Sequence, residues 1–275
     1  MTDRSPADGC YNRYMNTPLA KKALGQHWLE DDDSLTAMVQ AAQVRLGDEV
    51  LEIGPGYGTL TEYLLAAGAQ VRALEFDASL VTGLLAQFAN VPELRIEQGD
   101  IRTYDFTSMP PDYKIVANIP YYLTSNLIQL ISETPNQPSV AVLLMQKEVA
   151  ERVVAKPGSM SLLSVTAQFY WDARLDKVVG AELFTPPPKV DSQILVLQRR
   201  AGPLFTDIEP KQYFRVVKAG FSQKRKTLLN SLSGGLALSK DEARALLVQA
   251  DVEPTRRAQT LSLDEWHRLA QAILK

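Results

Sequence analysis

A short apolar run that leads into three alternating glycines is the feature of this sequence that most limits its fold. Residues 50–53 are largely apolar, Gly54, Gly56 and Gly58 follow, and a helical pattern begins at Thr59. Glycine is needed where a backbone turns tightly and where a ligand approaches it closely. The N-terminus of the following helix offers free amide groups and a positive dipole to an anion. The segment predicts a nucleotide-binding turn, although from this motif alone a purely structural turn is an alternative.

Short apolar runs alternate with helical patterns through the first two thirds of the 275 residues. The predicted strands are 49–53, 70–74, 94–98, 114–117, 140–145 and 192–197. The predicted helices between them are 59–67, 79–88, 125–132 and 147–154. Strands that alternate with helices build a parallel sheet with helices on both faces. The sequence therefore predicts an α/β domain of the Rossmann-like kind.

The last part of the chain changes character, because helical patterns follow one another there without a strand between them. They cover 211–221, 224–232, 240–250 and 264–274. Ser239 and Glu242 have the spacing of a capping box, which would start the third of these helices. Gly202 and Pro203 interrupt the pattern before the first helix. We predict a flexible N-terminal tail (1–20), a sheet domain (21–202) and a small all-helical C-terminal domain (203–275).

The composition excludes several classes of protein. With 45% hydrophobic and 22% charged residues, the chain has the balance of an ordinary folded domain. It contains no run of about 20 apolar residues and no secretory signal at its start, so we expect a cytoplasmic protein without a membrane span. Cys10 has no second cysteine to pair with, and His27 and His267 are the only histidines, so neither disulfides nor a zinc site is expected. The acidic run 30–33 fits the start of a helix better than a metal site.

Charge is distributed unevenly along the chain, which has a net charge of −3. Residues 1–185 contain 14 Lys and Arg against 23 Asp and Glu, a net charge of −9. Residues 186–275 contain 15 against 9, a net charge of +6. The basic C-terminal part predicts an anionic partner, although solvated helix faces would give the same asymmetry.

Acidic residues follow two further predicted strands. Glu75 lies 21 residues after Gly54, close to the spacing at which dinucleotide-binding folds place the carboxylate that binds ribose hydroxyls. Asp100 follows the next strand and could accept a hydrogen bond from an adenine amino group, with Phe76 or Ile101 packed against the ring. Suitable residues at three consecutive strand ends predict one cofactor site. From the glycine turn alone, that cofactor is either a nicotinamide nucleotide or S-adenosylmethionine.

The strand at 114–117 ends in Asn118-Ile119-Pro120-Tyr121, which carries the most specific chemistry in the chain. The carboxamide oxygen of Asn118 and the backbone carbonyl of Pro120 are two acceptors for one amino group, and binding both of its protons turns the nitrogen lone pair toward a methyl donor. Tyr121 offers a flat face on which an extruded base can stack, worth about 1–3 kcal/mol per base. The transfer is then a direct displacement that depends on alignment and electrostatics, without a general base. A structural proline turn is the alternative.

These motifs resemble one family, the ribosomal RNA adenine dimethyltransferases that modify two neighbouring adenosines near the 3′ end of small-subunit RNA. The resemblance runs from about Lys21 to the C-terminus. Besides the motifs above, it rests on the segments 22–29 (Lys-Ala-Leu-Gly-Gln-His-Trp-Leu), 146–152, 184–192 (Phe-Thr-Pro-Pro-Pro-Lys-Val-Asp-Ser) and 221–228. It implies a class I (Rossmann-like) methyltransferase sheet domain, S-adenosylmethionine as the cofactor and dimethyladenosine as the product, in ribosome biogenesis.

The resemblance also implies roles for individual residues. The cofactor contacts would be His27, Leu29, Gly54, Glu75, Asp100 and Asn118. Phe184, which precedes three prolines, would cover the target adenine opposite Tyr121. The family usually has Asn at the position of His27 and Phe at that of Trp28, and contacts made through the backbone are compatible with both changes.

Six cationic residues are candidates for RNA binding: Lys147, Arg152, Lys218, Lys224, Arg225 and Lys226. The last four fall within nine positions beside Phe221 and could neutralise phosphates, with a solvated helix face as the alternative. The first two have helical spacing, for which a salt-bridged surface is an equal alternative. We expect the partner to be small-subunit rRNA in a pre-30S particle. No dimerisation element is evident in the sequence, so a monomer is expected.

Three other functions compete with this interpretation. A macrolide-resistance methyltransferase would have the same build but act on large-subunit RNA, and the proline-rich segment 184–192 favours the small-subunit enzyme. A non-catalytic ribosome assembly factor could keep the fold, but the intact Asn118, Pro120, Tyr121 and Glu75 argue against it. A nicotinamide dehydrogenase is the third alternative.

Overall fold

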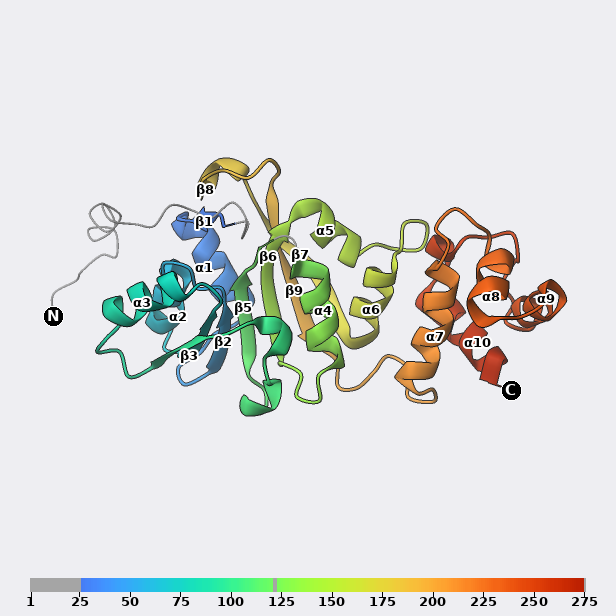
Figure 1. Ribbon diagram of the computed structural model, residues 1–275, viewed down its shortest axis with the longest axis horizontal. Helices are drawn as coiled ribbons and strands as arrows, with labels where there is room; N and C mark the ends of the chain where they lie inside the picture. Colours follow the sequence, from blue (N-terminus) through green and yellow to red (C-terminus); the bar gives the residue numbers. More distant parts are fainter. Residues whose placement is uncertain (1–25, 121–122, 275) are drawn as a thin grey trace.

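The computed structural model describes residues 26–120 and 123–274 (Figure 1). In this part of the chain, seven strands form one sheet in the order β4-β3-β2-β5-β6-β9-β7, and β1 pairs with β8 in a separate ribbon. The strands are β1 (Trp28–Leu29), β2 (Glu49–Ile53), β3 (Gln70–Glu75), β4 (Leu94–Gln98), β5 (Lys114–Asn118), β6 (Val140–Gln146), β7 (Trp171–Val179), β8 (Phe184–Thr185) and β9 (Ser192–Arg199). Strands β2 to β6 are parallel, so their carboxyl ends share one edge of the sheet.

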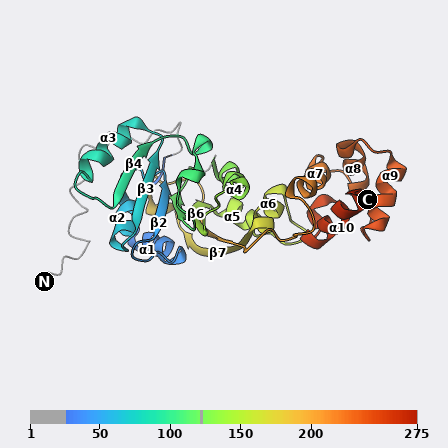
Figure 2. The same ribbon diagram turned by 90° about the horizontal axis from the view of Figure 1, so that it is seen from below.

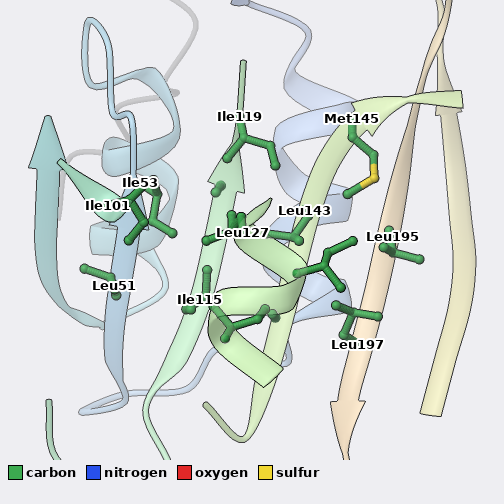
Figure 3. Close-up of a cluster of buried hydrophobic side chains, with 14 of the residues drawn as sticks. Leu51, Ile53, Ile101, Ile115, Ile119, Leu127, Leu143, Met145, Leu195 and Leu197 are labelled. Carbon is green, nitrogen blue, oxygen red and sulfur yellow. The ribbon is translucent and has the colours of Figure 1, made fainter. Parts of the chain in front are cut away.

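Helices cover both faces of this sheet (Figures 1 and 2). The helices of the sheet region are α1 (Asp32–Ala41), α2 (Thr59–Ala66), α3 (Ala78–Gln87), α4 (Thr124–Glu133), α5 (Lys147–Val153) and α6 (Leu162–Tyr170). Successive strand residues face opposite sides: Leu51 packs in the cluster that includes α4 and α5, whereas Val50 packs in the cluster that includes α1 and α2. Figure 3 shows Leu127 of α4 among Ile115 and Leu143 of the sheet. Both faces of the central strands are therefore buried, which explains the apolar runs in β5 and β6.

Side-chain caps start two of the helices where the sequence predicts them. The Asp31 carboxylate accepts a hydrogen bond from the Ser34 backbone amide at 2.9 Å, so the acidic run 30–33 begins α1. Ser239 and Glu242 form the predicted capping box of α9 (Lys240–Gln249). The predicted helix start at the acidic run and the predicted capping box are both confirmed.

The prediction of an all-parallel sheet is wrong for β9, which runs antiparallel to both β6 and β7. A parallel neighbour requires a crossover connection, usually a helix. The link from β7 to β9 contains only a short 3-10 turn and β8, so the chain returns in the opposite direction. Helix α6 and strand β7 are not predicted from the sequence pattern. The sheet is therefore mixed: β2 to β6 are parallel, and β9 and β7 complete the edge beyond β6.

The C-terminal helices α7 (Pro210–Phe221), α8 (Leu228–Leu236), α9 and α10 (Leu263–Leu274) group at the end of the molecule far from α3 (Figure 2). They bury their own cluster of side chains, including Tyr213 and Trp266. Phe169 and Val165 of α6 belong to the same cluster. The helical region is thus packed onto the sheet region through α6.

The predicted helix 224–232 begins too early. Residues 222–227 form a loop, and α8 starts at Leu228. The backbone amides of Leu228 and Leu229 donate to the carbonyls of Arg256 (2.7 Å) and Pro254 (3.3 Å). A distant loop therefore fixes the start of α8, and the cations of residues 224–226 lie on the α7–α8 loop.

Candidate active site

A pocket lies where the carboxyl ends of the parallel strands meet the β1–β8 ribbon. It encloses about 1220 Å³, including space open to solvent. The structure brings ten predicted site residues to its wall: His27, Leu29, Gly54, Glu75, Phe76, Asp100, Ile101, Asn118, Pro120 and Phe184. The predicted stacking residue Tyr121 lies outside the described residues. Ligands of open α/β sheets bind at this edge, so the position is that of a cofactor site.

The glycine turn after β2 has left-handed backbone geometry at each of its glycines. Gly54, Gly56 and Gly58 have φ values of +69°, +62° and +82°. A Cβ on Gly54 would meet no atom closer than the Asn118 carbonyl at 3.8 Å, so this position stays open toward the pocket. A Cβ on Gly56 would lie 2.5 Å from the Trp28 ring. Trp28 lies against Gly56, which is absent from the pocket wall, and the cofactor contact of Gly56 stays a prediction.

Glu75 ends β3 with only 6% of its surface exposed. Its Oε2 accepts a hydrogen bond from the Gly56 amide at 3.2 Å, and its Oε1 accepts one from the Asp77 amide at 2.8 Å. Burial raises the pKa of Glu75, and the backbone hydrogen bonds oppose this rise. A carboxylate has about four acceptor positions. Glu75 can therefore hold the turn and still accept hydrogen bonds from ribose hydroxyls.

Asp100 is paired with Arg102, a residue that the sequence analysis did not identify. The Asp100 carboxylate accepts from the Arg102 backbone amide at 2.9 Å, and Arg102 Nε lies 3.0 and 2.9 Å from its two oxygens. The side-chain hydrogen bonds from Arg102 lower the pKa of Asp100. Ile101 is buried beside them, whereas Phe76 is 55% exposed on the same pocket. The site therefore offers an ionised acceptor, Asp100, beside two apolar side chains. The Asp-x-Arg spacing is the sequence signal that could have identified Arg102.

Asn118 ends β5 on the pocket wall. Its Nδ2 donates to the backbone carbonyl of His27 at 3.3 Å, and among the described residues nothing donates to its Oδ1. The Pro120 carbonyl accepts from the Leu123 amide at 3.0 Å, which uses one of its two lone pairs. Asn118 is therefore oriented as an acceptor, and Pro120 retains one acceptor position.

The β1–β8 ribbon brings two distant segments to the pocket. Its register pairs Leu29 with Phe184 and Trp28 with Thr185. Phe184 is 3% exposed and packs in the cluster that includes α1 and α2 while lining the pocket. His27, next to the ribbon, places Nδ1 2.7 Å from the Pro186 carbonyl. The side chain of His27 thus has a partner that the sequence did not reveal.

Glu52 is a pocket residue that sequence reasoning missed. It is 1% exposed, and Thr61 Oγ1 donates to its Oε2 at 2.6 Å. Its Oε1 is buried and has no hydrogen-bond partner among the described residues. Burial raises the pKa of Glu52 to about 8. The signal was a lone acidic residue inside an apolar strand, two positions before Gly54.

The six cationic candidates are spread over two regions outside the pocket wall. Lys147 and Arg152 lie on α5, Lys218 lies on α7, and the remaining three lie on the α7–α8 loop. All are exposed except Lys147, which is half-buried. In the part of the chain that the structure covers, none of the six forms an ion pair. The salt-bridged alternative for α5 is therefore not observed.

Two further features, a metal site and a membrane-spanning helix, are not found among the described residues. Within 26–120 and 123–274, no three His, Cys, Asp or Glu side chains are arranged to hold a metal ion. Over the same residues, none of the helices combines the length and apolar character that crossing a membrane requires.

The strand order, the antiparallel strand β9 and a pocket at the glycine turn define a class I methyltransferase fold. The family model described as "Ribosomal RNA adenine dimethylase" matches residues 18–275. The chain is 41% identical over 253 residues to the ribosomal RNA small subunit methyltransferase A of Dehalococcoides mccartyi (strain 195), covering 91% of this chain and 87% of that protein. The chain belongs to the ribosomal RNA adenine dimethylase family of methyltransferases.

Two solved structures are similar over most of the chain. A dimethyladenosine transferase from Plasmodium falciparum superposes with a TM-score of 0.74 and 26% identity, over 88% of this chain and 95% of that one. The 23S rRNA methyltransferase ErmE superposes with a TM-score of 0.72 and 28% identity, over 90% and 100% of the two chains. Both similarities include the C-terminal helices as well as the sheet.

Proposed function

We propose that this protein transfers methyl groups from S-adenosylmethionine to the exocyclic amino group of adenine in small-subunit ribosomal RNA. Two transfers to each of two adjacent adenosines near the RNA 3′ end would give dimethyladenosine. The observation that carries the proposal is the oriented carboxamide of Asn118 on the pocket wall at the end of β5. Relatives named as small-subunit methyltransferases support the choice of RNA.

The contacts of Asn118 explain how it would act on an amino group. Because Nδ2 donates to the His27 carbonyl, the orientation of the carboxamide is fixed, and its Oδ1 can accept a hydrogen bond from a substrate. The remaining lone pair of the Pro120 carbonyl supplies a second acceptor. Together they would hold both amino protons and direct the nitrogen lone pair away from the ring. Fixed dipoles of this kind act without reorganising during the reaction, so they favour its transition state.

The pocket suits S-adenosylmethionine in charge. The carboxyl groups of Glu75 and Asp100 line it, which suits a cofactor that carries a positive charge. Glu75 would hold the ribose and Asp100 the adenine amino group, with Ile101 and Phe76 against the ring. Bound there, the cofactor supplies a methyl group activated by its sulfonium.

We further propose that residues 203–275 form an RNA-binding domain and that RNA phosphates contact the six cations described above. The separate side-chain cluster of α7–α10 and the unpaired charges on the α7–α8 loop support this. The target adenine would leave its stack to reach Asn118. A monomeric state and a cytoplasmic location stay predictions from the sequence.

Mass spectrometry of digested RNA tests the proposal. Unmethylated 30S particles treated with the protein and S-adenosylmethionine should contain two dimethyladenosines in the 3′-terminal fragment. Asn118→Ala should reduce the rate by about 10²-fold or more, as loss of one preorganised group does in other enzymes. Asn126→Ala, an exposed asparagine on α4 outside this pocket, is the matched control. An Asn118→Ala variant with the wild-type rate would refute the assigned role.

Large-subunit RNA is the second candidate substrate, because the structure is also similar to ErmE. Protein-free large-subunit RNA treated in parallel should stay unmodified. Methylation of that RNA alone would favour the macrolide-resistance activity. Faster particle maturation with no methylation of either RNA would favour a non-catalytic assembly factor.

A further inference from the structure

The β1–β8 ribbon ends at a pair that cannot exchange both backbone hydrogen bonds. The register pairs Leu29 with Phe184 and Trp28 with Thr185, so His27 lies opposite Pro186 in the next position. A hydrogen-bonded antiparallel pair exchanges two N–H to carbonyl bonds. Proline has no N–H, so Pro186 cannot donate to His27. The His27 carbonyl therefore needs a donor other than Pro186.

Two side chains supply hydrogen bonds to the carbonyls of His27 and Pro186. The His27 imidazole nitrogen Nδ1 lies 2.7 Å from the Pro186 carbonyl, and the Asn118 amide donates to the His27 carbonyl at 3.3 Å. A carbonyl oxygen only accepts, so Nδ1 of His27 carries a proton. Asn118, His27 and Pro186 therefore form a continuous series of hydrogen bonds at the pocket.

This series joins the two sides of the target-base end of the pocket. One side is Asn118 at the end of β5, and the other is the segment 184–186, which carries Phe184. Both Asn118 and Phe184 line the pocket. A shift of the segment 184–186 relative to β5 would change the space that an adenine must enter.

We propose that His27 is a positioning residue that couples Asn118 to Phe184. Its backbone carbonyl orients the Asn118 carboxamide, and its ring holds the segment that carries Phe184. The inference rests on the proposed methyl transfer, since it concerns the geometry of that site. An asparagine at position 27 could take over this role, because its side chain also carries an N–H donor.

Kinetics on 30S particles separate this role from direct cofactor binding. His27→Phe keeps a ring but removes the donor, and we expect kcat to fall about tenfold, the effect of losing one hydrogen bond. The Kd for S-adenosylmethionine should stay within about twofold, because the ring bonds to Pro186. His27→Asn should restore most of kcat. The proposal would be overturned if His27→Phe kept the wild-type kcat, or if it weakened only the binding of S-adenosylmethionine.

His267→Asn is the matched control, since it removes the chain's other histidine. His267 Nε2 lies 2.8 Å from Asp207 Oδ1 in the C-terminal region, outside the pocket wall. This variant should retain the wild-type kcat. Melting temperatures of all variants, measured alongside, would show whether a lower kcat reflects loss of folded protein.

Imidazole NMR tests the hydrogen bond without any reaction. The chain has two histidines, and the structure gives them opposite tautomers: Nδ1–H for His27, because a carbonyl accepts, and Nε2–H for His267, because a carboxylate accepts. Two-bond ¹H–¹⁵N spectra, at a pH where both rings are neutral, should show this pattern. An Nε2–H tautomer at His27 would overturn the coupling. An Nδ1–H tautomer in a protein that methylates no adenine would instead refute the proposed function.

Discussion

The carboxylate of Glu75 and the backbone amide of Gly56 lie 3.2 Å apart and form a buried hydrogen bond between β3 and the glycine turn. The Asp77 amide holds the other oxygen of the same carboxylate at 2.8 Å. The acid that is proposed to bind ribose therefore also fixes the turn before α2. A change of backbone at Gly56 should alter the position of Glu75.

Gly56→Ala and Gly47→Ala form a matched pair. Both glycines have left-handed geometry, which costs an alanine about 1–2 kcal/mol. Only at Gly56 would the Cβ also meet a ring, that of Trp28, whereas nothing lies within 4 Å at Gly47. Adding about 1–3 kcal/mol for overpacking, we expect Gly56→Ala to lower the free energy of unfolding by about 2–5 kcal/mol and to weaken cofactor binding.

Urea denaturation and calorimetric titration with S-adenosylmethionine measure both effects. Gly47→Ala should cost only the backbone term and leave cofactor affinity unchanged. Equal losses in the two variants would contradict the contact between Gly56 and Trp28.

The buried carboxyl of Glu52 predicts a pH-dependent stability. Its pKa is about 8 in the folded protein, against 4.5 for an ordinary glutamate. Between these values the folded state keeps a proton that the unfolded state has lost. The free energy of unfolding contributed by Glu52 therefore falls as pH rises, by up to about 1.4 kcal/mol per pH unit. Glu52→Gln keeps an acceptor for Thr61 and has no proton to lose, so it should remove this slope.

Unfolding free energies at pH 5, 6.5 and 8 check the prediction. The difference between Glu52→Gln and the wild type should shift in favour of the variant as pH rises. Glu93→Gln, an exposed residue before β4, controls for the loss of one carboxyl group. A constant difference across this range would show that Glu52 does not titrate there.

The Arg102 side chain should allow the cofactor to bind at lower pH. Its hydrogen bonds hold the pKa of Asp100 below the usual value, so the ionised acceptor persists to lower pH. In Arg102→Ala that pKa should rise. The loss of cofactor affinity on acidification should then begin at a higher pH than in the wild type.

Titrations with S-adenosylmethionine between pH 4 and 7 measure this shift. Arg174→Ala is a matched control, because Arg174 pairs with Asp176 at 2.8 Å with the same two-residue separation, outside the pocket wall. Coincident profiles for the wild type and Arg102→Ala would disprove the dependence on Arg102.

The α7–α8 loop should contribute a salt-dependent share of RNA affinity. Replacing Lys224, Arg225 and Lys226 with Gln should weaken binding and lower the slope of log K against log salt by about 2–3, since each phosphate contact contributes about 0.7–0.9. Filter binding over a range of salt concentrations measures the slope. The same change at the exposed Lys211, Lys240 and Arg244 removes equal charge from other surfaces. Identical slopes in both triple variants would mean that net charge alone decides binding.

The central strands were predictable because their signal is local. The predicted limits of β2 and β4 agree with the structure at both ends, since both strands stop before a glycine, Gly54 and Gly99. The ribbon of β1 and β8 was not predictable. Each strand has two residues, too few to show a period, and their pairing joins positions more than 150 residues apart. The start of α8 was missed because carbonyls of a distant loop fix it.

The site was predicted where position along a strand decides the chemistry. Glu75 and Asn118 end strands and Asp100 lies two residues after one, and parallel strands bring their ends together. Glu52 and Arg102 were missed because their importance comes from burial and from a partner, which depend on tertiary structure. At Gly56 the absence of a side chain makes room for the Trp28 ring, a contact that the local sequence does not reveal.

The packing of α6 limits how this protein can be recombined with its relatives. The Phe169 ring lies 4.8 Å from that of Tyr213 and 5.1 Å from that of Phe214, centre to centre. A chimera joined at residue 202 would set Phe169 from one parent against α7 from the other and disturb a close-packed aromatic cluster. A crossover placed after α5 would transfer both halves of that cluster together. It would instead set α6 and β9 of one parent against α4 and β6 of the other. Grafted C-terminal helices should therefore be tolerated best when the residues at these contacts are the same in both parents.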